Sequence, residues 1–340
     1  MVKSRADQGV QLSMLSIKEQ DRRFIVHGER ELLCRASPCS VEQHEQGRCM
    51  IIASRDDAPE VRVPLLFDHR TPSTLHIHVP AASSYLEGFV YIPGGPFVSG
   101  GDPNAFHPVY EEIVELRGFF CATYPVTFRE YLEWLDHLHA IHPDRAREHV
   151  PTLRNAEGPL AYFDEAQGHW VPDSVLIEGS ARDRYPERQG HEWSLPVIGI
   201  NAFDAEAFAS WKGEETGFPL RLPAARELEK AGRGTDGRFY TWGNRFDATF
   251  CKMRLSRQEP SQLEPVGTFQ HDVSPYGVRD LSGGVQEWCR SDREGAEDCP
   301  VFGGSWGQDE RASRLANRVR VLANARTSYI GMRLVYSIDE

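Results

Sequence analysis

The cysteines and their positions set the first limit on the chemistry of this chain. It has seven cysteines, an odd number, and no two of them form a Cys-x-x-Cys pair. The last is Cys299, and none occurs between Gly304 and Glu340. Soft thiolates hold Cu(I), and hydroxyl or imidazole groups replace them poorly. The C-terminal segment therefore offers no thiolate copper site. We expect reduced thiols rather than a disulfide framework.

A concentration of arginine and other polar residues follows the last cysteine, within residues 306–329 of an otherwise acidic chain. Arginine recognises carboxylate or phosphate through two parallel hydrogen bonds, and arginine and tyrosine are common in interfaces. The predicted ligand-binding residues are Trp306, Gln308, Asp309, Arg311, Ser313, Arg314, Asn317, Arg320, Asn324, Arg326 and Tyr329. The alternative is that many of these side chains form internal salt bridges with the abundant Asp and Glu.

Length and charge exclude several classes of protein. The chain has 340 residues, enough for one large domain or two ordinary ones, and its net charge is −12. General binding to nucleic acids or anionic membranes needs clustered basic charge, so neither is expected. No apolar run approaches the roughly 18 residues that cross a membrane. Residues 1–20 lack the apolar core of a secretory signal. A cytoplasmic location without membrane insertion is therefore expected.

The first part of the chain has a β-type pattern. Residues 1–21 are polar and mixed in charge, which predicts a flexible tail. In residues 22–80, short β-branched and aliphatic runs alternate with turn residues, which predicts a small β-sandwich with antiparallel strands. In the last run His76 and His78 share one strand face, where solvent exposure is the commoner outcome and metal binding the alternative. Residues 81–87 are a predicted linker.

The pattern changes in residues 88–340. Apolar residues at helical spacing after Thr127, with Glu130 three positions on, predict a helix that begins with a capping box. Residues 144–189 are polar and contain proline, which indicates a long surface insertion. The expected elements are strands at 88–97 and 109–121 and helices at 127–138, 204–215 and 223–232. The predicted fold class is therefore α+β.

An ordered set of short motifs runs through this second region. In chain order they are YIPGGPF (91–97), FFCATYPVTFREY (119–131), PVIGINAFDAEAFASW (196–211), RLPAARELEKAGRG (221–234), YTWG (240–243), PVG (265–267), SPYGVRDLSGGVQEW (274–288), GGSW (303–306) and GMRL (331–334). The set resembles the formylglycine-generating enzyme, or sulfatase-modifying factor, family. The resemblance implies a C-type-lectin-like fold with much irregular structure, preceded here by the small β-sandwich. Arg221 and Arg333 stand where family members keep arginines, for which a structural role is expected and ligand binding is the alternative.

The chain departs from the enzymes of this family at their metal sites. Members that oxidise a client cysteine bind copper through two cysteines downstream of the GGSW-like motif, and this chain has none there. Other relatives use iron bound by a His-x3-His-x-Glu pattern. His137, His139 and His142 lack that spacing, which leaves solvated histidines or an unusual site. We therefore expect neither copper nor formylglycine generation.

The resemblance also bears on calcium, which family members often bind. The corresponding segment here is GGVQEW, residues 283–288. Calcium takes about six to eight oxygen ligands. Ser282, Gly283 and Val285 would offer carbonyl oxygens, and Glu287 a carboxylate. Gly284 stands where the family has asparagine, so the resemblance leaves both the presence and the absence of this site open.

What remains is a binding role. Some non-catalytic members hold a ligand with the stretch between the GGSW and GMRL motifs, among them the variable proteins of diversity-generating retroelements. A β-rich segment before such a domain also resembles the C-terminal part of bacterial serine/threonine kinases, although no kinase motif is present. We expect a non-catalytic module that binds a protein or small molecule, in a signalling protein or as a retroelement-diversified protein. The alternative is a metal-dependent oxidoreductase that uses another site.

Overall fold

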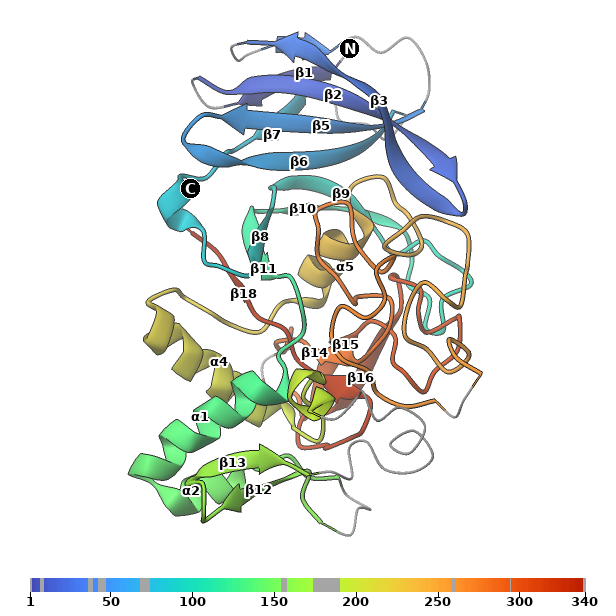
Figure 1. The fold of residues 1–340 in the computed structure, drawn as a ribbon. Coiled ribbons are helices and arrows are strands. Elements are labelled where there is room, and N and C mark those ends of the chain that lie inside the picture. Colours follow the sequence, from blue (N-terminus) through green and yellow to red (C-terminus); the bar gives the residue numbers. More distant parts are fainter. Residues whose placement is uncertain are drawn as a thin grey trace.

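The computed structural model describes residues 2–6, 9–35, 39–41, 47–67, 74–153, 158–173, 190–258, 261–293 and 295–338. Within these ranges the chain forms an N-terminal β-rich unit and a larger unit of helices, short strands and loops. Figure 1 shows the first unit lying across one end of the second, with α1, α2 and α4 at the opposite end. None of the described helices is both long and apolar enough to span a membrane.

The N-terminal unit contains two sheets. One has the order β3-β2-β5-β6, from β2 (Gln11–Gln20), β3 (Arg23–Cys34), β5 (Gly47–Arg55) and β6 (Ala58–Phe67). The other has the order β4-β1-β7, from β1 (Val2–Ala6), β4 (Cys39–Val41) and β7 (Thr74–Ile77). The first sheet is antiparallel throughout, as predicted. In the second sheet, by contrast, β1 pairs with β7 in parallel.

The start of the chain differs from the expected flexible tail. Residues 11–20 form β2, which lies between β3 and β5 and pairs with both. Val10 and Leu12 are fully buried. The polar, mixed sequence does not predict this strand, because its stability comes from two hydrogen-bonded neighbouring strands. It does not come from a regular alternation of apolar and polar residues.

Strand β5 is buried on both faces. Cys49, Ile51 and Ala53 belong to one hydrophobic cluster together with Ile77 of the second sheet. Since successive side chains of a strand point to opposite faces, Met50 and Ile52 point the other way, and both are also buried. Both faces of the four-stranded sheet are therefore covered along β5.

The second unit combines four small sheets with helices and long loops. Its strands are β8 (Phe89–Ile92), β9 (Gly95–Ser99), β10 (Glu112–Leu116), β11 (Phe119–Ala122), β12 (Ala161–Asp164), β13 (His169–Pro172), β14 (Gln286–Trp288), β15 (Asp298–Phe302), β16 (Arg318–Leu322), β17 (Ile330–Gly331) and β18 (Val335–Tyr336). Its helices are α1 (Phe128–Ile141), α2 (Pro143–Glu148), α4 (Ala202–Thr216), α5 (Ala225–Arg233) and the 3-10 turn η4 (His191–Ser194). The sheets have the orders β10-β9, β18-β11-β8, β12-β13 and β16-β15-β14-β17.

The predicted helices are confirmed as α1, α4 and α5. Thr127 caps α1: its side chain accepts from the backbone N–H of Glu130, and the Glu130 carboxylate accepts from the Thr127 N–H at 2.7 Å. Local sequence determines this start, because both partners lie within one helical turn. The predicted insertion 144–189 is more ordered than expected in its described parts, which include α2 and the β12–β13 hairpin. That hairpin packs through Trp170, which is buried.

The expected linker, residues 81–87, is anchored to the second unit. It contains the 3-10 turn η1 (Ala82–Ser84). The Tyr336 hydroxyl donates to the Ser84 carbonyl at 2.8 Å and accepts from the Leu86 N–H at 3.0 Å. Tyr85 packs edge-on against Phe120, with ring centroids 4.9 Å apart. The C-terminal strand thereby binds the connection between the two units.

Candidate functional site

Buried arginine–carboxylate pairs hold the loops around the C-terminal stretch. Arg333 is fully buried, and its Nη2 lies 2.8 Å from Glu287 Oε1. The same guanidinium donates to the backbone carbonyls of Ala122, Thr123 and Arg279. A buried guanidinium needs an acceptor for each of its N–H groups. Arg333 finds these acceptors inside the protein. The predicted structural role of this residue agrees with the geometry.

The only carboxylate among the residues proposed for calcium, that of Glu287, is already bonded to an arginine. Both carboxylate oxygens of Glu287 accept from Arg333 Nε, at 3.1 and 3.0 Å. A guanidinium in contact with the only carboxylate opposes a second cation there. In the part of the chain that the structure describes, no three His, Cys, Asp or Glu side chains are grouped to hold a metal ion. The contact with Arg333 therefore disfavours Glu287 as a calcium ligand.

Three of the predicted ligand-binding residues are buried and used inside the protein. Arg314 Nε lies 2.5 Å from the Asp102 carboxylate, and its Nη1 donates to the Tyr240 hydroxyl at 2.8 Å. The Asn317 side-chain oxygen accepts from the His107 backbone N–H at 3.0 Å. Ser313 is fully buried. Arg314 and Asn317 thus tie the C-terminal stretch to the loop after β9.

Two further arginines of the stretch form internal ion pairs. Arg320 bonds both Asp298, at 2.9 Å, and Asp292, at 2.6 Å. Arg326 pairs with Asp204 at 2.8 Å and donates to the carbonyl of Val150, also at 2.8 Å. Internal salt bridging was the alternative to ligand binding. It holds for three of the four predicted arginines, namely Arg314, Arg320 and Arg326. The fourth is Arg311.

An aromatic pair and Arg311 remain accessible in this stretch. The rings of Trp306 and Tyr329 lie 5.2 Å apart, and the indole N–H of Trp306 donates to the Ser328 carbonyl at 2.7 Å. The Tyr329 side chain is 41% exposed. Arg311 is exposed, and its guanidinium lies 5.8 Å from the ring of Phe106. Gln308 and Asp309 are half-buried, and Asn324 is exposed.

Two residues of this surface escaped the sequence prediction. Phe106 is 47% exposed, and its backbone N–H donates to the Arg311 carbonyl at 3.0 Å. Gly307 lies under the Tyr329 ring: a Cβ added there would stand 2.4 Å from a ring carbon. An isolated aromatic in a Gly/Pro-rich loop was the only local signal for Phe106. Nothing local marks Gly307, because its constraint comes from a residue 22 positions away.

The buried thiols are held in their protonated form. Among the described residues, Cys49, Cys121, Cys251, Cys289 and Cys299 are buried thiols, and Cys34 is half-buried. Burial raises the pKa of the Cys121 and Cys49 thiols to about 12. It also raises the pKa of Cys251 and Cys289 well above the ordinary value. Because only a thiolate binds copper or acts as a nucleophile, these side chains behave as small apolar groups.

Two buried carboxyl groups lie beside the β14 segment. Burial and the neighbouring Asp280 charge raise the pKa of Asp272 to about 7, and burial raises that of Asp280 to about 6. Asp272 Oδ1 accepts from the Thr241 hydroxyl at 2.7 Å, and its Oδ2 accepts from the Ser282 N–H at 3.2 Å. Both side chains are buried away from solvent. They form part of the scaffold rather than an accessible acid–base site.

Comparison with known proteins agrees with the motif pattern. Residues 77–338 match the model of the family described as the sulfatase-modifying factor enzyme 1-like domain. The inactive C-alpha-formylglycine-generating enzyme 2 of Mus musculus is 28% identical over 283 residues, 73% of this chain and 85% of that protein. The serine/threonine-protein kinase pkn1 of Chlamydia caviae is 26% identical over 64% of this chain.

Other matches are partial in length or in sequence. This chain spans 32% of the kinase and 42% of the uncharacterized protein YfmG of Bacillus subtilis, to which it is 28% identical over 241 residues. Among solved structures, PvdO from Pseudomonas aeruginosa has a TM-score of 0.54 and 20% identity, covering 74% of this chain and 94% of that one. At that identity the likeness shows the fold alone.

Proposed function

Since this chain belongs to the sulfatase-modifying factor enzyme 1-like family, we propose that it is a non-catalytic module of that family which binds a protein or small molecule. The lack of cysteine after Cys299 and the protonated, buried thiols support this proposal. So does the similarity to a relative whose name marks it as inactive. The similarity to a kinase supports a place in a bacterial signalling protein.

The proposed binding residues are the accessible members of the stretch, namely Trp306, Gln308, Asp309, Arg311, Asn324 and Tyr329. The observation that carries the proposal is the contrast between Arg311 and its neighbours. Arg314, Arg320 and Arg326 are all ion-paired internally, whereas Arg311 has no ion pair or side-chain hydrogen bond among the described residues. An unpaired guanidinium and an exposed tyrosine braced by a tryptophan are frequent anchors of protein interfaces.

A quantitative pull-down tests this proposal. The full chain is immobilised as wild type and as the variants Arg311→Ala and Tyr329→Ser, with Arg147→Ala as a control on an exposed arginine of α2. We expect captured partners to be lost from the first two variants and retained by the control. Partners retained equally by all four proteins would place the binding surface elsewhere.

Metal analysis tests the alternative of a metal-dependent oxidoreductase. The purified chain is expected to show no stoichiometric copper or iron and no oxygen consumption with thiol peptides. Either metal at one equivalent, together with oxygen uptake, would overturn the non-catalytic proposal. The retroelement version has its own test: a nearby near-copy of the DNA encoding residues 303–334, differing at adenines. Without that copy, the chain is not a diversified variable protein.

A further inference from the structure

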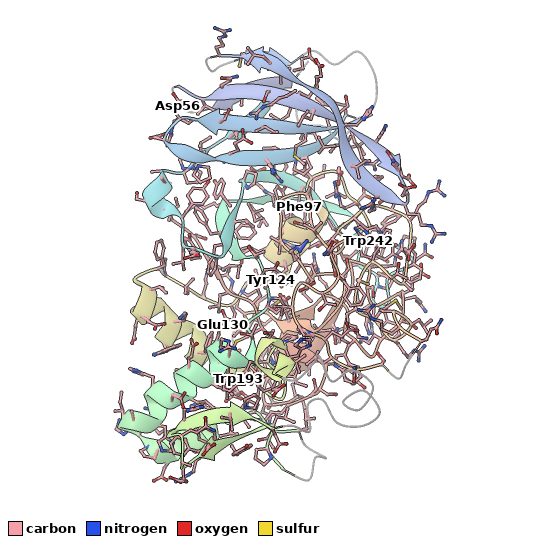
Figure 2. The ribbon with its side chains drawn as sticks, in the orientation of Figure 1. Asp56, Phe97, Tyr124, Glu130, Trp193 and Trp242 are labelled. Carbon is pink, nitrogen blue, oxygen red and sulfur yellow. The ribbon has the colours of Figure 1, made fainter. Side chains whose placement is uncertain are left out.

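A cleft lies between the two units, on the second face of the four-stranded sheet. Its volume is about 500 Å³, within the range of small-molecule sites. On one side it is lined by the sheet, and on the other by loops of the second unit that include Trp242, His271 and Pro275. Figure 2 shows Trp242 beneath the sheet, among those loops. Nothing proposed above for the C-terminal stretch involves this cleft.

The two walls are held together by polar contacts outside the cleft or at its rim. The Phe24 backbone N–H donates to the Trp242 carbonyl at 2.7 Å. Arg22 pairs with Asp247 at 3.0 Å. Gly243 leaves room for the first of these contacts, since an added Cβ would lie 3.3 Å from the Phe24 ring and its φ is +149°. The cleft is therefore a defined space between docked units rather than a gap between independent ones.

The sheet wall of the cleft is aliphatic. Strand register places Ile17 opposite Val26, Leu15 opposite Met50, and Ser13 opposite Ile52. Since paired residues share a face, the five aliphatic side chains form one continuous surface. Val26 is 47% exposed, so this end of the aliphatic surface is open to solvent. The wall thus offers a lining for an aliphatic chain.

The polar groups of the cleft are all cationic or neutral. Arg23, Arg62, Arg238 and His271 line it, and no Asp or Glu does. Arg238 is neutralised by Asp236 at 2.8 Å. Arg23 Nη1 lies 3.0 Å from His271 Nδ1, while its buried Nε has no partner among the described residues. Arg62 stands opposite Ile52 in the sheet, is exposed, and has no ion pair in the described ranges.

We propose that this cleft binds an aliphatic monocarboxylate, with its chain on the Leu15–Ile52 wall and its carboxylate on Arg62. The protein has a net charge of −12, yet the guanidinium groups of Arg23 and Arg62 have no carboxylate partner among the described residues. This indicates an anionic ligand. The aliphatic wall indicates an apolar body for the same ligand. Arg62 supplies the head-group contact because its donors are free and accessible, and guanidinium binds carboxylate through two parallel hydrogen bonds. Arg23 adds positive potential beside the neutral His271.

Titration calorimetry of the full chain with decanoate, below its micellar concentration, tests the proposal. One equivalent is expected to bind, and Arg62→Gln is expected to weaken binding about tenfold through loss of a charge-assisted contact. Ile52→Asp, which places a carboxylate on the wall, is expected to abolish it. The control Arg117→Gln changes an exposed arginine outside the cleft and is expected to bind as wild type. Circular dichroism checks that each variant is folded.

A methyl-labelled sample locates the ligand. Of the five methionines, Met50 lines the cleft, whereas Met253 and Met332 are fully buried elsewhere. In protein labelled with ¹³C-methyl methionine, decanoate is expected to shift the Met50 signal, which Met50→Leu assigns. The signals of Met253 and Met332 are expected to stay unchanged. Absence of binding at millimolar decanoate, equal binding of decylamine or 1-decanol, or an unshifted Met50 signal would each overturn the proposal. A peptide that competes better than decanoate would overturn it in favour of a protein ligand.

Discussion

Arg314 and Asp102 form a buried ion pair that joins positions 212 residues apart, with Nε 2.5 Å from the carboxylate oxygen. Neither side chain has appreciable contact with solvent. The Tyr240 hydroxyl, which donates to Glu310 at 3.0 Å, also accepts from this arginine. The pair therefore positions the stretch that contains Arg311 and the proposed binding residues.

Breaking this pair on one side is expected to be costly. Asp102→Ala or Arg314→Ala leaves an uncompensated buried charge, which typically costs about 3–5 kcal/mol. Urea unfolding of each variant measures the loss. The double variant Asp102→Ala/Arg314→Met is expected to lose less than the sum of the single losses, because it leaves no buried charge unpaired. Additive losses would show that the two side chains act independently.

The elevated pKa of Asp272 predicts a pH-dependent stability. The folded state binds this proton more tightly than the unfolded chain, since its pKa is about 7 instead of 3.8. The stability that protonated Asp272 contributes to the folded state is therefore complete below about pH 4 and is lost as pH rises through 7. Asp272→Asn cannot ionise and is expected to lack this loss of stability, which amounts to roughly 4 kcal/mol. Melting temperatures of both proteins from pH 4 to 8 measure it, and parallel curves would contradict the raised pKa.

Gly307 is expected to control the orientation of Tyr329. In Gly307→Ala the new methyl would meet the ring, whose nearest carbon lies 2.4 Å from an ideal Cβ, so the tyrosine must turn away. We expect a changed tyrosine or tryptophan near-UV circular dichroism signal and weaker partner capture. Gly158→Ala is the matched control, because no atom lies within 4 Å of its added Cβ. Equal spectra for the two variants would contradict the close packing.

The buried thiols are expected to resist modification in the folded protein. Cys49, Cys121, Cys251, Cys289 and Cys299 are buried, and the thiolate that reacts with iodoacetamide is disfavoured there. Peptide mass spectrometry after brief alkylation at pH 8 is expected to find these five unmodified. The same treatment in guanidinium chloride is expected to modify all of them. Rapid native labelling of Cys251 or Cys289 would indicate a reactive site inside the scaffold.

Short-range features of this protein followed from the sequence by itself. The capping box of Thr127 and Glu130, the three long helices and the missing thiols after Cys299 were all recognisable, because each depends on residues close together in the chain or on composition. The ordered motifs identified the fold for the same reason, since each is a local turn or packing pattern.

Only the tertiary structure decided which polar side chains are free. Arg311 and Arg314 are three positions apart and identical in type, yet one is exposed and the other is buried on Asp102. Strand β2 likewise owes its place to two partner strands rather than to its own pattern. Partner choice over a hundred or more residues depends on how the loops pack, which short-range sequence patterns do not encode. For this reason the sequence patterns predicted neither which residues of the stretch 306–329 are accessible nor the cleft beside Arg62.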